Sequence, residues 1–160
     1  MEKINSLTGM TDLIETKADE NVLANKVFQT EKILKEIFTN YAMSEIRTPA
    51  LENTNLFKRS VGDTSDIVNK ELYTFSDKND KSITLRPEGT ASVMRSIIEK
   101  KLDGETHKLW YLGPMWRYER PQKGRYRQFN QAGIEILGYP EGAPEFEMIS
   151  LICELNRKLQ

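Results

Sequence analysis

The sequence predicts an α+β fold, in which an antiparallel β-sheet is flanked by helices. Strand-like segments follow one another through short polar turns, and this arrangement favours antiparallel pairing. Segments with the apolar spacing of helices stand before, between and after these strands. Together the two patterns are typical of helices packed against one antiparallel sheet.

The first expected helix covers residues 21–40 and ends near Asn40. Four of its apolar residues keep helical spacing: Val27, Leu34, Ile37 and Phe38. A short strand is expected next, over residues 44–48, and Pro49 ends it because proline cannot donate to a β-ladder. Residues 72–76 and 82–86 then predict a hairpin around the turn-forming residues 77–80.

A second helix is expected over residues 88–102. The face expected to be buried contains Ala91, Met94, Ile97, Ile98 and Leu102. Two long strands, 108–118 and 127–138, should follow, joined by a polar loop. The last expected helix covers residues 146–159, and Cys153 should be an ordinary core residue. Its inner face is expected to contain Met148, Ile149, Ile152, Leu155 and Leu159.

The composition indicates a soluble globular protein, with 160 residues, 38% apolar and 29% charged. Apolar runs stay well short of the roughly 18 residues that a membrane helix needs, and we expect neither a membrane partner nor a secretory signal. The single cysteine excludes an internal disulfide. These features favour the cytoplasm. One histidine and one cysteine also make a zinc site or a Cys/His nucleophile unfavourable.

The loop between the two long strands has a strong local charge. Between Arg117 and Arg127 five basic residues oppose Glu119 alone, a balance of +4, although the whole chain carries −1. Arginine suits a planar grip on phosphate. Arg117, at the end of the strand, and Arg125, in the loop, could hold one polyphosphate from two sides. The alternative is an ordinary solvated charged loop.

The strand after the loop alternates in character. Four residues should share one face, and Ile134 and Ile136 the other: Phe129, Gln131, Gly133 and Glu135. Gly133 lets a ligand approach the backbone, and Gln131 and Glu135 are about 13 Å apart at roughly 3.3 Å per residue. A small polar ligand could lie between them. A solvated sheet face would explain the same pattern.

A second candidate site is Arg86-Pro87-Glu88-Gly89-Thr90, where a strand ends and a helix begins. Thr90 is expected to be the N-cap of that helix. Glu88 could project from the rim of the sheet and bind a cation such as an α-ammonium group. Plain helix capping would account for Glu88 and Thr90 equally well.

These motifs resemble the class II aminoacyl-tRNA synthetases and, within them, the histidyl-tRNA synthetase family. Motif 2 of the class is matched by Arg117, Glu119 and Phe129, and residues 119–129 are typical of the histidine enzyme. Residues 86–90 also match that family. Residues 41–49 resemble motif 1, and 7–12 resemble the family's N-terminal segment, with Thr8 in place of the usual Arg before Gly9.

The resemblance implies activation of L-histidine by ATP with Mg²⁺, and transfer of the histidyl group to tRNA(His). Arg117 would be the catalytic residue, stabilising charge as pyrophosphate leaves. The implied ATP-binding residues are Arg117, Glu119, Arg125 and Phe129. The implied histidine-binding residues are Glu88, Gly89, Thr90, Arg117, Gln131 and Glu135. The implied tRNA-binding residues are Arg120, Gln122 and Lys123. No metal site made of protein side chains alone is expected.

The same resemblance predicts what residues 1–160 contain. They correspond to the N-terminal part of the catalytic domain, with motifs 1 and 2 but without motif 3 or an anticodon-binding domain. We therefore expect a truncated or naturally split product that holds the motif 2 half of the site and activates histidine weakly or not at all. A homodimer is expected through motif 1.

Two other functions fit the same sequence. One is a regulatory subunit of ATP phosphoribosyltransferase, which shares this fold. Retention of Arg117, Arg125, Gln131 and Glu135 argues against it. The other is an RNA-binding module that uses the basic loop, and it predicts salt-sensitive tRNA binding without ATP.

Overall fold

The structure is a computed structural model, and it describes residues 3–15, 22–62, 67–120 and 122–159. The chain divides into two compact units. The first contains Met1–Asp12, Arg47–Leu102 and Leu112–Gly133, and the second contains Leu13–Ile46, Asp103–Tyr111 and Ile134–Gln160. The two longest strands, β5 (His107–Trp116) and β6 (Gln128–Leu137), run through both units as neighbours in one sheet of order β1-β5-β6.

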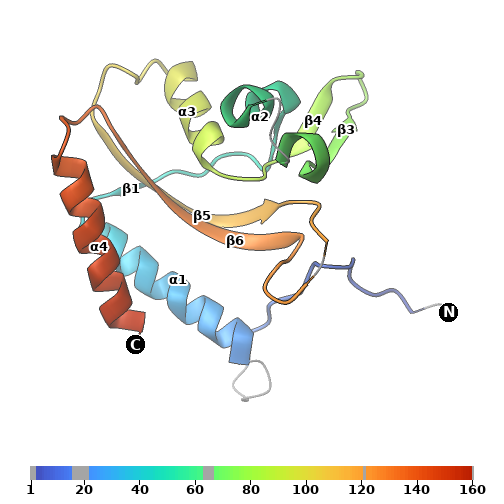
Figure 1. Ribbon diagram of the computed structural model, residues 1–160, viewed down its shortest axis with the longest axis horizontal. Helices are drawn as coiled ribbons and strands as arrows, with labels where there is room; N and C mark the ends of the chain where they lie inside the picture. The colour runs from blue at the N-terminus through green and yellow to red at the C-terminus, as the bar shows by residue number, and fades with distance from the viewer. Residues whose placement is uncertain (1–2, 16–21, 63–66, 121, 160) are drawn as a thin grey trace. The chain divides into compact units, whose positions relative to one another are not determined.

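The first unit contains a small antiparallel sheet of order β2-β4-β3, made of β2 (Leu51–Asn53), β3 (Thr74–Ser76) and β4 (Ser82–Leu85). The expected hairpin is confirmed, with Phe75 paired to Ile83 across β3 and β4. Figure 1 shows this hairpin and helix α2 (Thr54–Val61) in green.

A hydroxyl cluster joins α2 to the hairpin. Thr54 Oγ1 lies 2.8 Å from both Ser82 Oγ and Thr84 Oγ1, and Thr74 Oγ1 lies 3.0 Å from Thr84 Oγ1. Because Thr84 is fully buried, these bonds satisfy a hydroxyl that has no access to water. The surrounding core of the first unit is apolar and comprises Phe57, Ala91, Val93, Ile97 and Met115.

The second unit packs helix α1 (Val22–Asn40) beside helix α4 (Ala143–Leu159), as Figure 1 shows. Polar contacts between them include Lys158 Nζ to Glu36 Oε1 at 2.6 Å. Trp110 of β5 meets Phe38 of α1 with ring centroids 5.1 Å apart. The predicted burial of α1 is confirmed at Leu34, Ile37 and Phe38, and the helix ends at Asn40 as expected.

The strand expected over residues 44–48 is shorter, β1 (Ser44–Glu45), and pairs with β5 in parallel. A parallel partner requires a long crossover, and the whole segment between β1 and β5 provides one. Between β1 and residue 72, the sequence predicted no helix or strand. The structure has β2, α2 and the π-helix η2 (Ile67–Glu71) there.

The predicted inner faces of two helices are partly wrong. In α4 the buried residue is Leu151, whereas Ile149 is 60% exposed and Ile152 50% exposed. The apolar stripe of α4 is broad enough for two faces, and packing selected the one centred on Leu151. Leu159 and Cys153 are also exposed. In α3 (Thr90–Glu99), Ile98 is exposed while Ser92, Val93 and Ser96 are buried.

Candidate functional site

A cleft of about 360 Å³ opens beside the loop that joins β5 to β6, in the first unit. It brings together all four residues predicted to bind ATP. Among the residues that the structure describes, the lining is Glu71, Arg117, Glu119, Gly124, Arg125, Tyr126 and Phe129. A cleft with two arginines, two carboxylates and two aromatic rings offers partners for a phosphate, for amino groups and for a flat base.

Arg117 follows the last residue of β5 and is held in place by the backbone. Its main-chain N–H donates to Arg127 O at 3.0 Å, which closes the neck of the loop. Its Nε donates to the carbonyl oxygen of Pro87 at 2.9 Å. The guanidinium carbon lies 5.2 Å from the centre of the Phe129 ring. One donor is therefore used for orientation, and the Nη1 and Nη2 groups remain to grip an anion.

Arg125 lies in a tight turn of the loop and lines the same cleft. A bridge pairs Gln122 with Arg125, and Gly124 supplies the positive φ of 82° that the turn needs. Arg125 Nη1 lies 3.5 Å from Glu119 Oε2, and 61% of the Arg125 side chain is exposed. The Glu119 side chain is only 17% exposed, so this ion pair joins a mostly buried carboxylate to a guanidinium that water reaches and screens.

Glu88 caps helix α3 in this structure. Its Oε2 accepts the N–H of Thr90 at 2.6 Å, and its Oε1 accepts the N–H of Ala91 at 3.0 Å. The N-cap position belongs to Gly89, so the expectation that Thr90 is the N-cap is wrong by one residue. Glu88 takes the capping role because its longer side chain reaches forward to two unsatisfied amides. The carboxylate predicted to bind an α-ammonium group is therefore the one that caps this helix.

Arg86 is a structural brace beside this site. Its Nε donates to Pro114 O at 3.1 Å, and its Nη1 donates to Thr48 O at 2.8 Å. A Cβ added at Gly113 would lie 3.0 Å from Arg86 Nη2, so this part of β5 approaches the guanidinium closely. Arg86 thus fixes the end of β5, from which Arg117 projects.

Gln131, predicted to bind histidine, has a polar atom without a protein partner. Its Oε1 is buried and makes no hydrogen bond within the described part of the chain. An orphaned amide oxygen is costly and is often kept for a ligand. Gly133 lies on the same strand. Glu135 also belongs to β6, but it lies in the second unit.

The structure also locates the residues predicted to contact tRNA and the cleft residues that the sequence did not predict. The three predicted to contact tRNA, Arg120, Gln122 and Lys123, are exposed. Glu71, Gly124 and Tyr126 line the cleft but were not among the residues predicted to bind ATP. No motif in the sequence marks Glu71, whereas Tyr126 stands beside Arg125 and could have been predicted from that position.

Within the described ranges, no three His, Cys, Asp or Glu residues gather as a metal site, and no helix is long and apolar enough to span a membrane.

The site combines a loop that carries Arg125 and other basic residues with the neighbouring strand β6, which carries Phe129 and Gln131. A family model described as histidyl-tRNA synthetase matches residues 20–160. The chain therefore belongs to the histidyl-tRNA synthetase family, as the motifs predicted.

Two curated relatives, both named histidine–tRNA ligase, match 81% of this chain. The protein of Desulfitobacterium hafniense is 55% identical over 131 residues, and that of Geobacter sulfurreducens is 54% identical. The chain spans 31% and 32% of their lengths, about a third.

Two solved structures share the predicted α+β fold. Apo histidyl-tRNA synthetase from S. aureus matches with a TM-score of 0.76 and 38% identity, covering 98% of this chain and 35% of that one. A Bacillus halodurans protein titled ATP phosphoribosyltransferase regulatory subunit/histidyl-tRNA synthetase matches with a TM-score of 0.77 over 99% of this chain and 40% of that one. At 21% identity, the second match bears on the fold alone.

Proposed function

We propose that this chain forms the motif 2 half of a site that activates L-histidine with ATP and serves the charging of tRNA(His). The observation that carries the proposal is the cleft shared by Arg117, Glu119, Arg125 and Phe129. Phe129 offers its ring to adenine, Glu119 can accept from the adenine amino group, and Arg125 reaches the outer phosphates. Mg²⁺ would arrive bound to those phosphates.

In the proposed first step, a carboxylate oxygen of histidine attacks the α-phosphorus of ATP. The bond from that phosphorus to the bridging oxygen breaks, giving histidyl-adenylate and pyrophosphate. Arg117 would contact both the α-phosphate and the substrate carboxylate, so it neutralises charge where the new bond forms. Such a step needs positioning and charge neutralisation more than a protein nucleophile.

Histidine would be held beside this cleft by its α-ammonium group and its side chain. Within the first unit, Glu88 would supply a carboxylate for the ammonium, and Gly89, Thr90 and Gln131 would contribute to the same binding site. In the second step, a terminal ribose hydroxyl of tRNA attacks the histidyl carbonyl and releases AMP. The exposed side chains of Arg120, Gln122 and Lys123 would meet the acceptor end. A homodimer built through residues 41–49 is part of the same proposal.

The test is an NMR titration of the isotopically labelled 160-residue chain, first with MgATP and then with histidine. We expect MgATP to shift the amides of Arg125 and Phe129, and Arg117→Ala to remove these shifts. Absence of any MgATP effect on the wild-type loop would refute the proposal. Histidine-dependent pyrophosphate exchange should be weak or absent, and exchange at rates typical of an intact synthetase would contradict the expectation of a half site.

A regulatory role on a phosphoribosyltransferase is the second candidate, because regulatory subunits of that enzyme share the fold that the sequence predicts. The 55% identity to a histidine–tRNA ligase favours the synthetase. The two candidates differ in the ligands expected. A regulator that senses histidine would show histidine shifts without MgATP shifts in the same titration.

A further inference from the structure

The loop between β5 and β6 is held at both ends by carbonyl groups from distant parts of the sequence. At its far end, the N–H groups of Arg127 and Gln128 both donate to Gly9 O, at 2.7 and 3.2 Å. At its near end, Tyr118 N donates to Glu71 O at 2.7 Å. The position of the loop therefore depends on two segments outside it.

Gly9 is suited to its place because no side chain fits there. Its φ is +79°, in the left-handed region that favours glycine. A Cβ at this position would lie 2.9 Å from Arg127 Cγ and 3.1 Å from Arg127 N. Any larger residue would therefore push directly on the residue that ends the loop.

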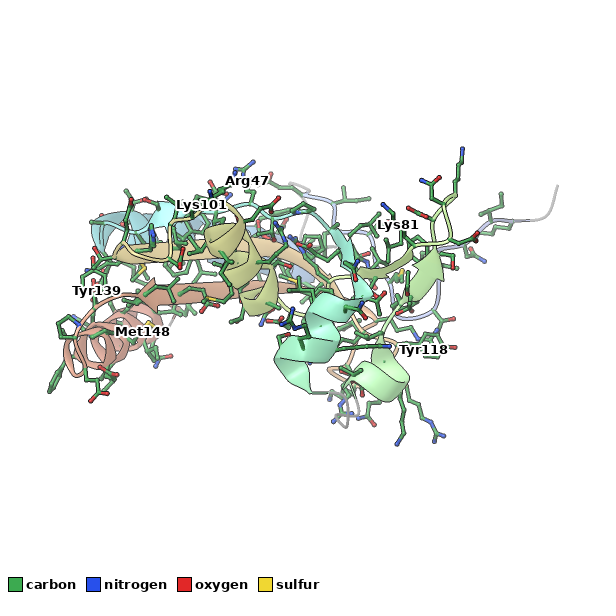
Figure 2. All side chains as sticks on the ribbon, turned by 90° about the horizontal axis from the view of Figure 1, so that it is seen from above. Arg47, Lys81, Lys101, Tyr118, Tyr139 and Met148 are labelled. Carbon is green, nitrogen blue, oxygen red and sulfur yellow. The ribbon has the colours of Figure 1, made fainter. Side chains whose placement is uncertain are left out.

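Tyr118 holds the loop from the other side. The guanidinium carbon of Arg127 lies 4.0 Å from the centre of its ring, and the Tyr73 ring meets it edge-on with centroids 5.5 Å apart. Arg127 Nε also donates to Glu119 O at 3.1 Å. Tyr118, labelled in Figure 2, is 52% exposed, so ring contacts rather than deep burial hold it in place.

We propose that Gly9 and Tyr118 are positioning residues, which fix the two ends of the loop so that Arg125 faces Arg117 across the cleft. Neither residue lines the cleft itself. The inference rests on the proposed function for the identity of the anion, ATP. The inference that Gly9 and Tyr118 order the loop depends only on their contacts with Arg127, Gln128, Glu71 and Tyr73.

The first test is Gly9→Ala, with Gly142→Ala as the matched control. Gly142 also has a positive φ, of 93°, but no atom lies within 4 Å of the Cβ it would gain. Both variants carry backbone strain, and only Gly9→Ala disturbs the loop. We expect the amides of Arg127 and Gln128 to exchange with solvent at least about tenfold faster in Gly9→Ala, and MgATP binding to weaken by a similar factor.

The second test compares Tyr118→Phe with Tyr118→Leu and remains available if Gly9→Ala fails to fold. Phenylalanine keeps the ring that Arg127 and Tyr73 contact, whereas leucine removes it. We expect Tyr118→Phe to retain MgATP affinity and Tyr118→Leu to lose it, at similar melting temperatures. Equal affinities in the two variants would contradict a positioning role for Tyr118.

The two readouts separate this inference from the proposed function. If wild type fails to bind MgATP but Gly9→Ala still accelerates exchange at Arg127 and Gln128, the proposed function fails and the positioning role stands. If Gly9→Ala and Gly142→Ala leave these amides equally protected, the positioning role of Gly9 is overturned, whatever the chain binds.

Discussion

Arg117 donates from Nε to the carbonyl oxygen of Pro87, at 2.9 Å, and this bond sets the direction in which its other donors point. Pro87 stands between the brace Arg86 and the helix cap Glu88. A short run of sequence therefore orients β5, Arg117 and helix α3 together.

Arg117→Lys should lower MgATP affinity by about tenfold or more, although it keeps the charge. Lysine has no second donor group with which to contact Pro87 O and a phosphate in the same geometry. Stability should fall by only about 1 kcal/mol, the usual net contribution of one hydrogen bond. NMR titration measures the first effect and urea unfolding the second. MgATP affinity equal to wild type in Arg117→Lys would show that charge alone suffices.

Glu88→Gln separates capping from ligand binding. Glutamine keeps one acceptor for the amides of Thr90 and Ala91, so stability should fall by less than about 1 kcal/mol, whereas Glu88→Ala should cost about 1–2 kcal/mol. If Glu88 also binds the α-ammonium of histidine, both variants lose histidine-induced NMR shifts. Unchanged histidine shifts in Glu88→Gln would leave Glu88 with the capping role only.

Gln131→Leu should keep or raise stability, by up to about 1 kcal/mol, because it removes a buried oxygen that has no partner among the described residues. The same change should abolish histidine-induced shifts. Gln128→Leu is the matched control on the same strand: Gln128 Oε1 accepts from Trp116 Nε1 at 3.1 Å, and its loss should destabilise the fold by about 1 kcal/mol. A Gln131→Leu variant that is clearly less stable than Gln128→Leu would argue against this interpretation.

Asp77 should make the hairpin turn sensitive to acid. Hydrogen bonds from the backbone N–H groups of Lys81 and Asn79, at 2.9 and 2.7 Å, lower the pKa of its carboxyl below the usual 3.8. A group whose pKa is lowered by folding contributes stability above its unfolded pKa of about 3.9, and this contribution disappears as pH falls through the folded value.

An NMR titration of the Asp77 carboxyl should therefore show a midpoint below 3.8. The amides of Asn79 and Lys81 should shift with the same midpoint. In Asp77→Asn that transition should vanish from both amides. A midpoint at or above the usual value would mean that the turn does not hold the carboxylate in solution.

The sequence predicted those parts of the fold that depend on local patterns. Helix α1, the β3–β4 hairpin and the long strands β5 and β6 all lie within a few residues of the expected ranges. Between residues 50 and 71, β2 and η2 were missed because they have only three and five residues, too short for a periodic signal. The inner face of α4 was misplaced because its apolar stripe is broad, and only tertiary packing on Leu151 selects among the possible faces.

The candidate site was predictable where chemistry and motif coincide, at Arg117, Glu119, Arg125 and Phe129. The contributions of backbone carbonyls were not predictable. Pro87 O, Glu71 O and Gly9 O orient the loop through main-chain atoms, and no side-chain pattern marks them. The role of Glu88 as a helix cap was foreseen as an alternative, but only the structure shows that both its oxygens accept amides.

The ion pair between Arg95 and Glu52 should respond asymmetrically to mutation. Arg95 Nη2 lies 2.7 Å from Glu52 Oε1, and the side chains are 29% and 7% exposed. The hydrogen bond from Arg95 to Glu52 raises the pKa of Arg95. Arg95 has a second partner, because its Nη1 lies 2.6 Å from Glu99 Oε2. In the Arg95–Glu52 pair, Glu52 is the more deeply buried side chain, since it is 7% exposed.

Arg95→Met should therefore destabilise the chain by about 3 kcal/mol or more, since it leaves the buried Glu52 carboxylate unpaired. Glu52→Gln should cost only about 1–2 kcal/mol, because the amide still accepts from Arg95, which keeps Glu99 and access to water. Glu36→Gln, which breaks the exposed pair with Lys158, is the control and should cost less than about 1 kcal/mol. Urea unfolding measures all three variants. If Glu52→Gln proved as costly as Arg95→Met, the stability would depend on the charge of Glu52 itself rather than on avoiding an unpaired buried carboxylate.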